Sequence, residues 1–284
     1  MGKIIDRVRT RIRYTCHPRA LLWWYYQKRC PTKPLIASLR RDLKVRIHPQ
    51  DVIGRYIYVD GIFETLEWEF VSSFLQSGMT VFDLGANIGQ YTLLAAKSVG
   101  PTGRVHSFEP SHRMFDELCF NVDLNGMSQI CVLNNVAISD RRGNAMLSKH
   151  APGEEVFGSL APQHRFVGRS VVGYEEVEIT TLDEYVRENG ISHVDFIKID
   201  IEGAELLALR GAKQLLSGRD GPTILVELAD VTTQGFGYRA FDIWDFLSDF
   251  GYRMYWPRAV ECGLRAMERP CDFSVAANVV AMKR

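Results

Sequence analysis

An acidic residue stands directly before a glycine turn in the stretch VFDLGANIGQYT, residues 81–92. In an open parallel sheet, ligands bind beyond the carboxyl ends of the strands, and glycines in the first turn let the backbone approach them. Gly85 and Gly89 have this placement, but the stretch lacks the middle glycine of the G-x-G-x-x-G pattern that accommodates a pyrophosphate. Asp83 would repel a pyrophosphate and attract an ammonium or a sulfonium. The turn therefore predicts S-adenosylmethionine, which carries both cations and no phosphate.

A second acid, Glu109, supports a ligand that contains adenosine. It lies 20 residues after Gly89, at the end of the next strand-like run. From this position a carboxylate accepts hydrogen bonds from the two ribose hydroxyls. Nicotinamide cofactors share this feature, so Glu109 indicates adenosine and not the whole cofactor. The alternative for both acids is structural: Asp83 would cap the turn, and Glu109 would be a surface acid at a strand end.

A second group of acids lies in FIKIDIEGAE, residues 196–205. Acids at a helix N-terminus are favoured by its free N–H groups, which accounts for Glu205 without a function. Asp200 ends a buried strand that faces the ligand crevice, and we predict catalytic roles for Asp200 and Glu202. Such a carboxylate could take the proton of an alcohol as it is methylated, or the two acids could help to bind a divalent ion. Two acids without an assured third ligand do not favour a metal, and none is predicted. His150 and His164 are alternative bases.

Strands and helices alternate along most of the chain and must position these acids. Strand-like runs cover residues 80–83, 104–109, 130–134, 195–200, 223–227, 252–255 and 274–281. Helical patterns cover residues 63–75, 89–98, 112–125, 203–217 and 240–249. Such alternation predicts a largely parallel sheet that is covered on both faces.

Two segments depart from this rhythm. Residues 44–48 and 56–59 predict a hairpin-like pair of strands before the first helix. Between residues 140 and 192, glycines and prolines interrupt the pattern, and no periodic element is evident before 177–179. We expect this interval to be an insertion over one edge of the sheet that selects the substrate.

The charge is distributed unevenly along the 284 residues, although the formal net charge is zero. Residues 1–50 hold 13 Lys and Arg against two Asp, a net charge of +11, together with the aromatic run ALLWWYY. A basic, aromatic segment suits an anionic membrane surface or a nucleic acid backbone. The alternative is a solvated helix face that packs on the acidic remainder of the chain. We predict that residues 1–30 form a surface-seeking helix at the inner face of a membrane.

Other features indicate a cytoplasmic protein. No apolar run approaches the roughly 20 residues that span a bilayer, and the N-terminal apolar run is not followed by a small-residue cleavage site. The six cysteines show no metal-ligand spacing, which favours reduced thiols. The sequence makes no prediction of the oligomeric state.

The motifs FDLGANIGQYT, SFEP, TTLDEYV and FIKIDIEGAE together resemble the FkbM family of S-adenosylmethionine-dependent methyltransferases, of the class I superfamily. The resemblance covers about residues 45–282, so residues 1–43 are predicted to be a separate segment and residues 44–284 the methyltransferase domain. It implies a Rossmann-like three-layer α/β sandwich with a seven-stranded, mostly parallel sheet and an antiparallel last strand. It implies cofactor contacts at Asp83, Gly85, Ala86, Asn87, Gly89, Glu109 and Ala137. The implied reaction is O-methylation of a hydroxyl on a sugar, glycan, polyketide or other natural product.

Two other functions are compatible with the sequence. An RNA-directed methyltransferase would use the basic N-terminal segment, but Asp200-Ile201-Glu202-Gly203 stands where an Asn/Asp-Pro-Pro-aromatic segment often serves base-amine methylation. A non-catalytic, membrane-associated module would keep the fold alone, and the intact acids at both cofactor positions argue against it.

Overall fold

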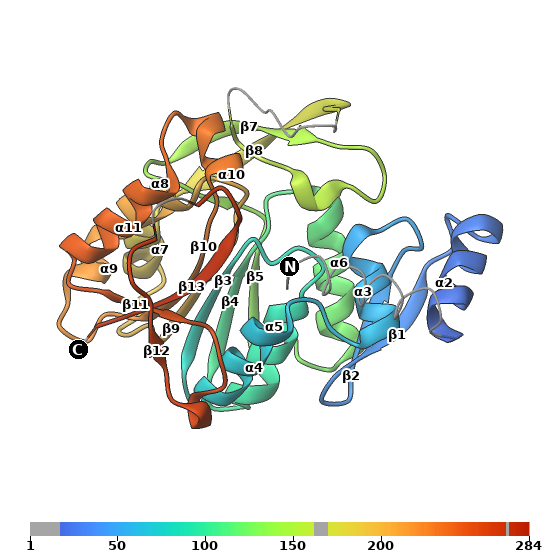
Figure 1. Cartoon of the computed structure of the whole chain (residues 1–284), viewed down its shortest axis with the longest axis horizontal. Helices are drawn as coiled ribbons and strands as arrows, with labels where there is room; N and C mark the ends of the chain where they lie inside the picture. Colours follow the sequence, from blue (N-terminus) through green and yellow to red (C-terminus); the bar gives the residue numbers. More distant parts are fainter. Residues whose placement is uncertain (1–17, 162–169, 271–272, 284) are drawn as a thin grey trace.

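The centre of the molecule is a mixed sheet with helices on both faces (Figure 1). The computed structural model describes residues 18–161, 170–270 and 273–283. The sheet has the strand order β12-β11-β13-β10-β9-β3-β4-β5. Its strands are β3 (Thr80–Leu84), β4 (Arg104–Phe108), β5 (Cys131–Asn134), β9 (Phe196–Ile199), β10 (Thr223–Leu228), β11 (Arg253–Trp256), β12 (Arg265–Ala266) and β13 (Ala277–Met282). Strands β10, β9, β3, β4 and β5 run parallel to one another, whereas β13 runs antiparallel between β10 and β11.

This sheet confirms the predicted α/β class, with a largely parallel arrangement and an antiparallel last strand. The described sheet has eight strands where seven were predicted. The extra strand is β12, which pairs with the end of β11 at the edge of the sheet. Two residues are too few to show the alternation that marks a strand in a sequence.

Successive residues of the central strand β3 point into two separate cores. Val81 belongs to a core with residues of α4 (Thr65–Phe74), α5 (Gln90–Val99) and α6 (His112–Leu124). Phe82 belongs to a core on the other face. The helices of that face are α7 (Leu182–Glu188), α8 (Glu205–Arg210), α9 (Lys213–Ser217) and α11 (Ala240–Asp249). Each core joins one face of the sheet to a layer of helices, so the sandwich has three layers: helices, sheet and helices.

One predicted helix is divided in two. Residues 203–217 form α8 and α9, which are separated at Gly211. A Cβ atom on Gly211 would lie 2.1 Å from the carbonyl oxygen of Ser139. The chain therefore breaks its helix where the backbone of another segment approaches it closely.

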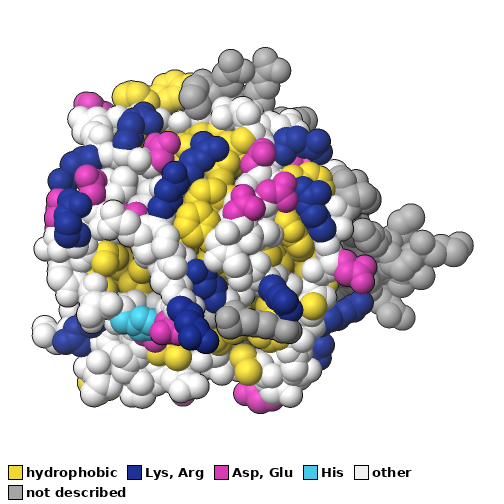
Figure 2. Space-filling view, turned by 90° about the vertical axis from the view of Figure 1, so that its left-hand side faces the viewer, with side chains coloured by type: hydrophobic (Ala, Val, Ile, Leu, Met, Phe, Trp, Pro, Cys, Tyr) yellow, Lys and Arg dark blue, Asp and Glu magenta, His cyan; other side chains and the backbone are white. Residues whose placement is uncertain are grey.

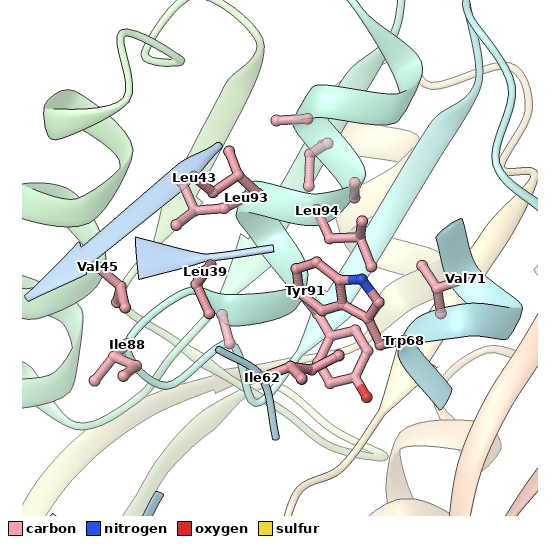
Figure 3. Packing of buried hydrophobic residues seen from close by; sticks show 14 of the residues in the cluster. Leu39, Leu43, Val45, Ile62, Trp68, Val71, Ile88, Tyr91, Leu93 and Leu94 are labelled. Atoms are coloured by element: carbon pink, nitrogen blue, oxygen red, sulfur yellow. The ribbon is translucent and has the colours of Figure 1, made fainter. Parts of the chain in front are cut away.

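The N-terminal region differs from the predicted pair of strands. The hairpin consists of β1 (Leu35–Leu39) and β2 (Leu43–Ile47), and the predicted strand at 56–59 lies inside helix α3 (Val52–Asp60). Helix α2 (Pro18–Arg29) packs against α3. Figure 3 shows Leu43 of the hairpin beside Leu93 of α5 and Val45 near Ile88, and Leu39 belongs to the same core. Residues on both sides of the predicted domain boundary at 43/44 therefore share one core.

The interval 140–192, in which the sequence shows no periodic element before 177–179, contains two of the three strands of a second sheet. Strand β8 (Gly173–Thr180) pairs antiparallel with β7 (Gly143–Lys149) and parallel with β6 (Ala137–Ile138). A short 3-10 helix, η1 (Glu155–Phe157), follows β7. The expectation of no periodic element before 177–179 was wrong: the apolar residues of β7 form one run, 145–147, and the first half of β8 is mostly polar, so neither shows the alternation that marks a strand. This small sheet lies beyond the carboxyl ends of the central strands (Figure 1).

Two further helical segments follow β10, and one follows β11. They are α10 (Asp230–Thr233), η2 (Gln234–Phe236) and η3 (Val260–Cys262). No helix in the described part of the chain has both the length and the apolar character needed to cross a bilayer. The described cysteines, namely Cys30, Cys119, Cys131 and Cys262, are free thiols.

Candidate functional site

A cavity of about 280 Å³ lies at the carboxyl ends of the central strands. Its size is near the lower end of the range for small-molecule sites. Seven of the nine predicted site residues line it: Gly85, Ala86, Asn87, Glu109, Ala137, Asp200 and Glu202. The other two, Asp83 and Gly89, are not among the lining residues. The fold thus brings the turn after β3, the end of β4 and the loop after β9 around one space.

The glycine turn is held against the loop after β9. Gly85 has φ +79°, and a Cβ atom there would lie 1.9 Å from the carbonyl oxygen of Asp200. The N–H groups of Gly85 and Ala86 both donate to the carbonyl oxygen of Phe108, each at 3.0 Å. Only glycine allows this approach, so the turn presents its backbone as the cavity wall.

Gly89 serves packing in this arrangement. It has φ +94° and stands at the N-cap of α5, where a Cβ atom would lie 2.8 Å from the Leu118 side chain of α6. Gly89 is not among the residues that line the cavity, and its contact with the cofactor stays a prediction.

Glu109 closes the turn from the end of β4. Its carboxylate accepts hydrogen bonds from the N–H groups of Asn87 at 2.8 Å and Ser111 at 2.9 Å. Burial raises the pKa of Glu109 to about 7, although both hydrogen bonds act in the opposite direction. Because Glu109 also lines the cavity, its remaining lone pairs are available to hydroxyl groups of a ligand.

Asp83 lies behind the wall of the cavity. Its side chain is buried, and its Oδ2 atom accepts a hydrogen bond of 2.7 Å from the Thr92 hydroxyl. Within the described residues its Oδ1 atom has no hydrogen-bond partner. Burial raises the pKa of Asp83, and the nearby Lys198 ammonium opposes that shift. Asp83 is thus placed to act on a bound cation through the field of a buried carboxylate.

Lys198 is a functional candidate that the sequence did not reveal. It is only 5% exposed, lines the cavity, and pairs in register with Asp83 across strands β9 and β3. Its Nζ atom lies 2.9 Å from Oδ2 of Asp200 and 4.7 Å from the centroid of the Tyr91 ring. Burial alone would lower the pKa of Lys198, but the carboxylates of Asp200, Asp83 and Glu64 outweigh it and raise the pKa. The lysine therefore remains charged.

Two glutamates from distant parts of the chain join this group. Glu64 lines the cavity, and its Oε2 atom accepts a 3.0 Å hydrogen bond from the Tyr91 hydroxyl. Burial, reinforced by the Asp200 carboxylate, raises the pKa of Glu64 to about 7. The same two causes raise the pKa of Glu202 and of Glu227 well above the usual value. A charged residue within an otherwise apolar strand, as in FIKI and TILVEL, is the sequence signal that could have identified Lys198 and Glu227.

Backbone strain is concentrated around the cavity. Outside the turn of the β1–β2 hairpin, the described non-glycine residues with positive φ are Glu64, Asn87 and Glu202, at 61°, 51° and 53°. All three line the cavity. Such conformations are unfavourable for residues with a Cβ atom, and they cluster at sites whose surroundings hold a required geometry.

The segment after β7 forms a roof over the cavity. Leu147, Phe157 and Leu160 line it from this side. The Ser159 hydroxyl donates a 2.7 Å hydrogen bond to the carbonyl oxygen of Glu202 and so joins the roof to the loop after β9. His150, one of the alternative bases, is buried and does not line the cavity, and His164 lies outside the described residues.

The polar groups in and behind the cavity wall suit S-adenosylmethionine. Glu109 offers acceptors to ribose hydroxyls, and the unpartnered Asp83 oxygen provides negative charge next to the turn. Gly85, Ala86 and Asn87 line the cavity, so a ligand there would lie along the turn. The described residues contain no group of three or more His, Cys, Asp or Glu arranged to hold a metal ion.

Comparison with known proteins gives one family. Residues 83–254 match the model of the methyltransferase FkbM domain. The methyltransferase sdnD of Sordaria araneosa is 30% identical over 166 residues, which are 49% of this chain and 62% of that protein. The 31-O-demethyl-FK506 methyltransferase FkbM of Streptomyces tacrolimicus is 27% identical over 180 residues, which are 55% of this chain and 66% of that protein. Each match spans less than two thirds of the relative's length.

Among solved structures, the methyltransferase FkbM of Methylobacillus flagellatus superimposes with a TM-score of 0.43 at 19% identity. The superposition covers 73% of this chain and 44% of that chain.

Proposed function

The chain belongs to the methyltransferase FkbM family, and from this premise we propose that it methylates a hydroxyl oxygen of a sugar, glycan or other natural product. The methyl donor of the family is S-adenosylmethionine. The observation that carries the proposal is that one cavity is lined both by the turn and Glu109 and by the carboxylates of Asp200 and Glu202. The printed name of one relative, 31-O-demethyl-FK506 methyltransferase, describes O-methylation of a natural product and supports this acceptor class.

The residues divide the work of the reaction. When bound, S-adenosylmethionine supplies a methyl group on a sulfonium, so that a C–O bond forms as the C–S bond breaks and its electron pair stays on sulfur. The chain must hold the acceptor oxygen in line, exclude water and take the hydroxyl proton. We assign the proton to the carboxylate of Asp200, which the Lys198 ammonium fixes at 2.9 Å.

Two glutamates lie beside Asp200 and differ from it in their surroundings. Burial, reinforced by the Asp200 carboxylate, raises the pKa of Glu202 and of Glu227, which favours the protonated form that can donate a hydrogen bond. Both line the cavity. The acceptor half thus offers one fixed carboxylate and two glutamates with raised pKa values, a combination suited to a substrate with several hydroxyls.

Two measurements test the proposal in sequence. The first is isothermal titration of the protein with S-adenosylmethionine, with NAD as the comparison ligand. We expect binding in the micromolar range for the former alone, and absence of binding would refute the cofactor assignment.

The second measurement identifies the atom that is methylated. Hydroxylated sugars, polyketides and RNA are incubated with the enzyme and S-adenosylmethionine carrying a trideuterated methyl group. Mass spectrometry and NMR then locate the label. The expected result is a labelled methyl group on an oxygen of a sugar or polyketide. A labelled methyl group on nitrogen, or on RNA alone, would overturn the proposed acceptor class. Asp200→Asn is the matched control, since it should still bind the cofactor.

A further inference from the structure

Helix α2 exposes an apolar face that the fold does not use. Leu21, Leu22, Trp24 and Tyr25 are between 49% and 61% exposed, although all four are large and apolar or aromatic. A surface helix of a globular protein ordinarily directs its polar residues to solvent. Clustered exposed apolar side chains mark an interaction surface. We propose that this face of α2 binds the surface of an anionic membrane.

The opposite side of the helix is fixed to the protein. Trp23 is 1% exposed, and its ring lies 5.4 Å from the ring of Tyr58 in α3. A Cβ atom on Gly54 of α3 would lie 3.2 Å from the Trp23 ring, so the small residue gives the indole its space. Tyr26 also contacts Tyr58, with 6.1 Å between the ring centroids. Helix α2 is therefore held in place while its other side faces solvent.

The charges around α2 select an anionic partner. The helix PRALLWWYYQKR contains no acidic residue, and Lys28 and Arg29 occupy its last turn. The preceding residues 1–17 add five Lys and Arg against one Asp in sequence. By contrast, the side of the molecule opposite α2 carries basic and acidic side chains intermixed (Figures 1 and 2). Apolar insertion and basic charge are the two signals that together hold a protein on anionic lipid.

The types of exposed residue fit a membrane better than a folded partner. Trp and Tyr are enriched at the membrane–water interface, where the ring lies in the apolar region and the polar group reaches water. Leu21 and Leu22 would enter the acyl boundary beside them. Helix α3, on which α2 rests, contributes Val52 and Ile53 to the cavity wall. If α2 binds the membrane, only α2 itself would therefore lie between the lipid and α3, the helix that forms this part of the cavity wall.

The test is vesicle flotation with the full chain. Phosphatidylcholine vesicles are compared with vesicles that also contain phosphatidylglycerol, each at low and high salt. The wild type should float with the anionic vesicles only, and less at high salt. The double variant Trp24→Ser, Tyr25→Ser should lose about tenfold or more in vesicle affinity.

A matched control replaces exposed aromatic residues elsewhere. The double variant Trp256→Ser, Tyr174→Ser removes side chains that are 41% and 56% exposed on β11 and β8. It should float like the wild type. Circular dichroism and S-adenosylmethionine binding should be unchanged in both variants, which separates this test from the proposed enzymatic function.

Three outcomes would overturn the proposal. The first is that the wild type does not float with anionic vesicles. The second is that the Trp24, Tyr25 variant floats as well as the wild type. The third is that the wild type is a dimer in light scattering and that this variant is a monomer, since the face would then be covered by a second copy. Binding to RNA that depends on Trp24 and Tyr25, without flotation, would assign the surface to nucleic acid instead.

Discussion

The loops after β3 and β9 are neighbours in the sheet, yet they contribute to the cavity in different ways. Each follows a parallel strand and leads into a helix, and an acid stands at or near its start. Asp83 lies within β3, two residues before the first loop, and does not line the cavity, whereas the backbone at Gly85 does. In the loop after β9, the carboxylates of Asp200 and Glu202 themselves line the cavity.

Both loops are closed by a buried glutamate in the same manner. Glu109 accepts the N–H groups of Asn87 and Ser111, and Glu205 accepts those of Ile201 and Gly203. Burial is the main cause that raises the pKa of each glutamate to about 7. Only Glu109 lines the cavity. The comparison indicates that the loop after β3 contributes mainly backbone to the cavity wall, whereas the loop after β9 contributes carboxylate side chains.

The largest effect should follow from filling the contact between the two loops. Gly85→Ala would place a Cβ atom 1.9 Å from the Asp200 carbonyl oxygen at a residue with φ +79°. We expect a loss of about 3–5 kcal/mol in the free energy of unfolding, together with loss of S-adenosylmethionine binding. Urea denaturation and titration calorimetry measure the two effects.

Gly126→Ala is the control for conformation alone. Its φ is +66°, and a Cβ atom there would meet nothing within 4 Å. It should cost about 1 kcal/mol. Equal destabilisation by the two substitutions would contradict the role assigned to the contact between the loops.

Asp200→Asn should affect the reaction and not the cofactor. The amide keeps the size of the side chain but accepts no proton, so methyl transfer should fall roughly 100-fold or more. The dissociation constant for S-adenosylmethionine should change by less than about threefold, since the cofactor half of the cavity is untouched. Single-turnover assays with a labelled methyl group provide the first value and calorimetry the second. Normal turnover would exclude Asp200 as the proton acceptor.

Glu205 should make the stability of the ligand-free protein depend on pH. Its pKa is about 7 in the folded chain against 4.5 for an ordinary glutamate, so the folded state holds a proton that the unfolded state releases in this interval. The stabilisation is complete below about pH 4.5 and is lost as the pH rises through about 7. In Glu205→Gln, the free energy of unfolding should fall by roughly 2 kcal/mol less over this pH range than in the wild type.

Glu109→Gln sharpens the same measurement. This substitution removes a second carboxyl group that titrates in the same range, because burial raises the pKa of Glu109 to about 7 as well. Thermal unfolding between pH 5 and about pH 8 should show the same direction of change for both variants, whereas only Glu109→Gln should weaken cofactor binding. Weakened cofactor binding in Glu205→Gln would contradict the inference that only Glu109 contacts the ligand.

The smallest effect is expected at Asp83. Asp83→Asn keeps an acceptor for the Thr92 hydroxyl but removes a charge from behind the wall. We expect affinity for S-adenosylmethionine to fall about tenfold, because a buried charge acts on a cation without direct contact. Affinity for the uncharged thioether product should change less, as titration of both ligands would reveal. Equal losses for the two ligands would favour a purely structural role for Asp83.

The sequence by itself determined the order of strands and helices and the acids that end β3, β4 and β9. These features are local: a short apolar run, a glycine turn and a helical repeat each depend on residues close in the chain. For the same reason, the sequence identified seven of the residues that line the cavity: five among the contacts that the resemblance implies, and Asp200 and Glu202 from their own pattern.

Only the tertiary structure decided which side chains face the cavity. Asp83 and Gly89 stand in the matching motif but are not among the lining residues: the Asp83 carboxylate accepts a hydrogen bond from Thr92, and Gly89 lies where a Cβ atom would meet Leu118. Glu64, Lys198 and Glu227 come from three distant elements and meet because the strand register and the start of α4 place them side by side. A local pattern cannot specify such a meeting, since it depends on how separate elements pack. The β7–β8 pair was missed because the apolar residues of β7 form one run, 145–147, and the first half of β8 is mostly polar, so neither segment alternates.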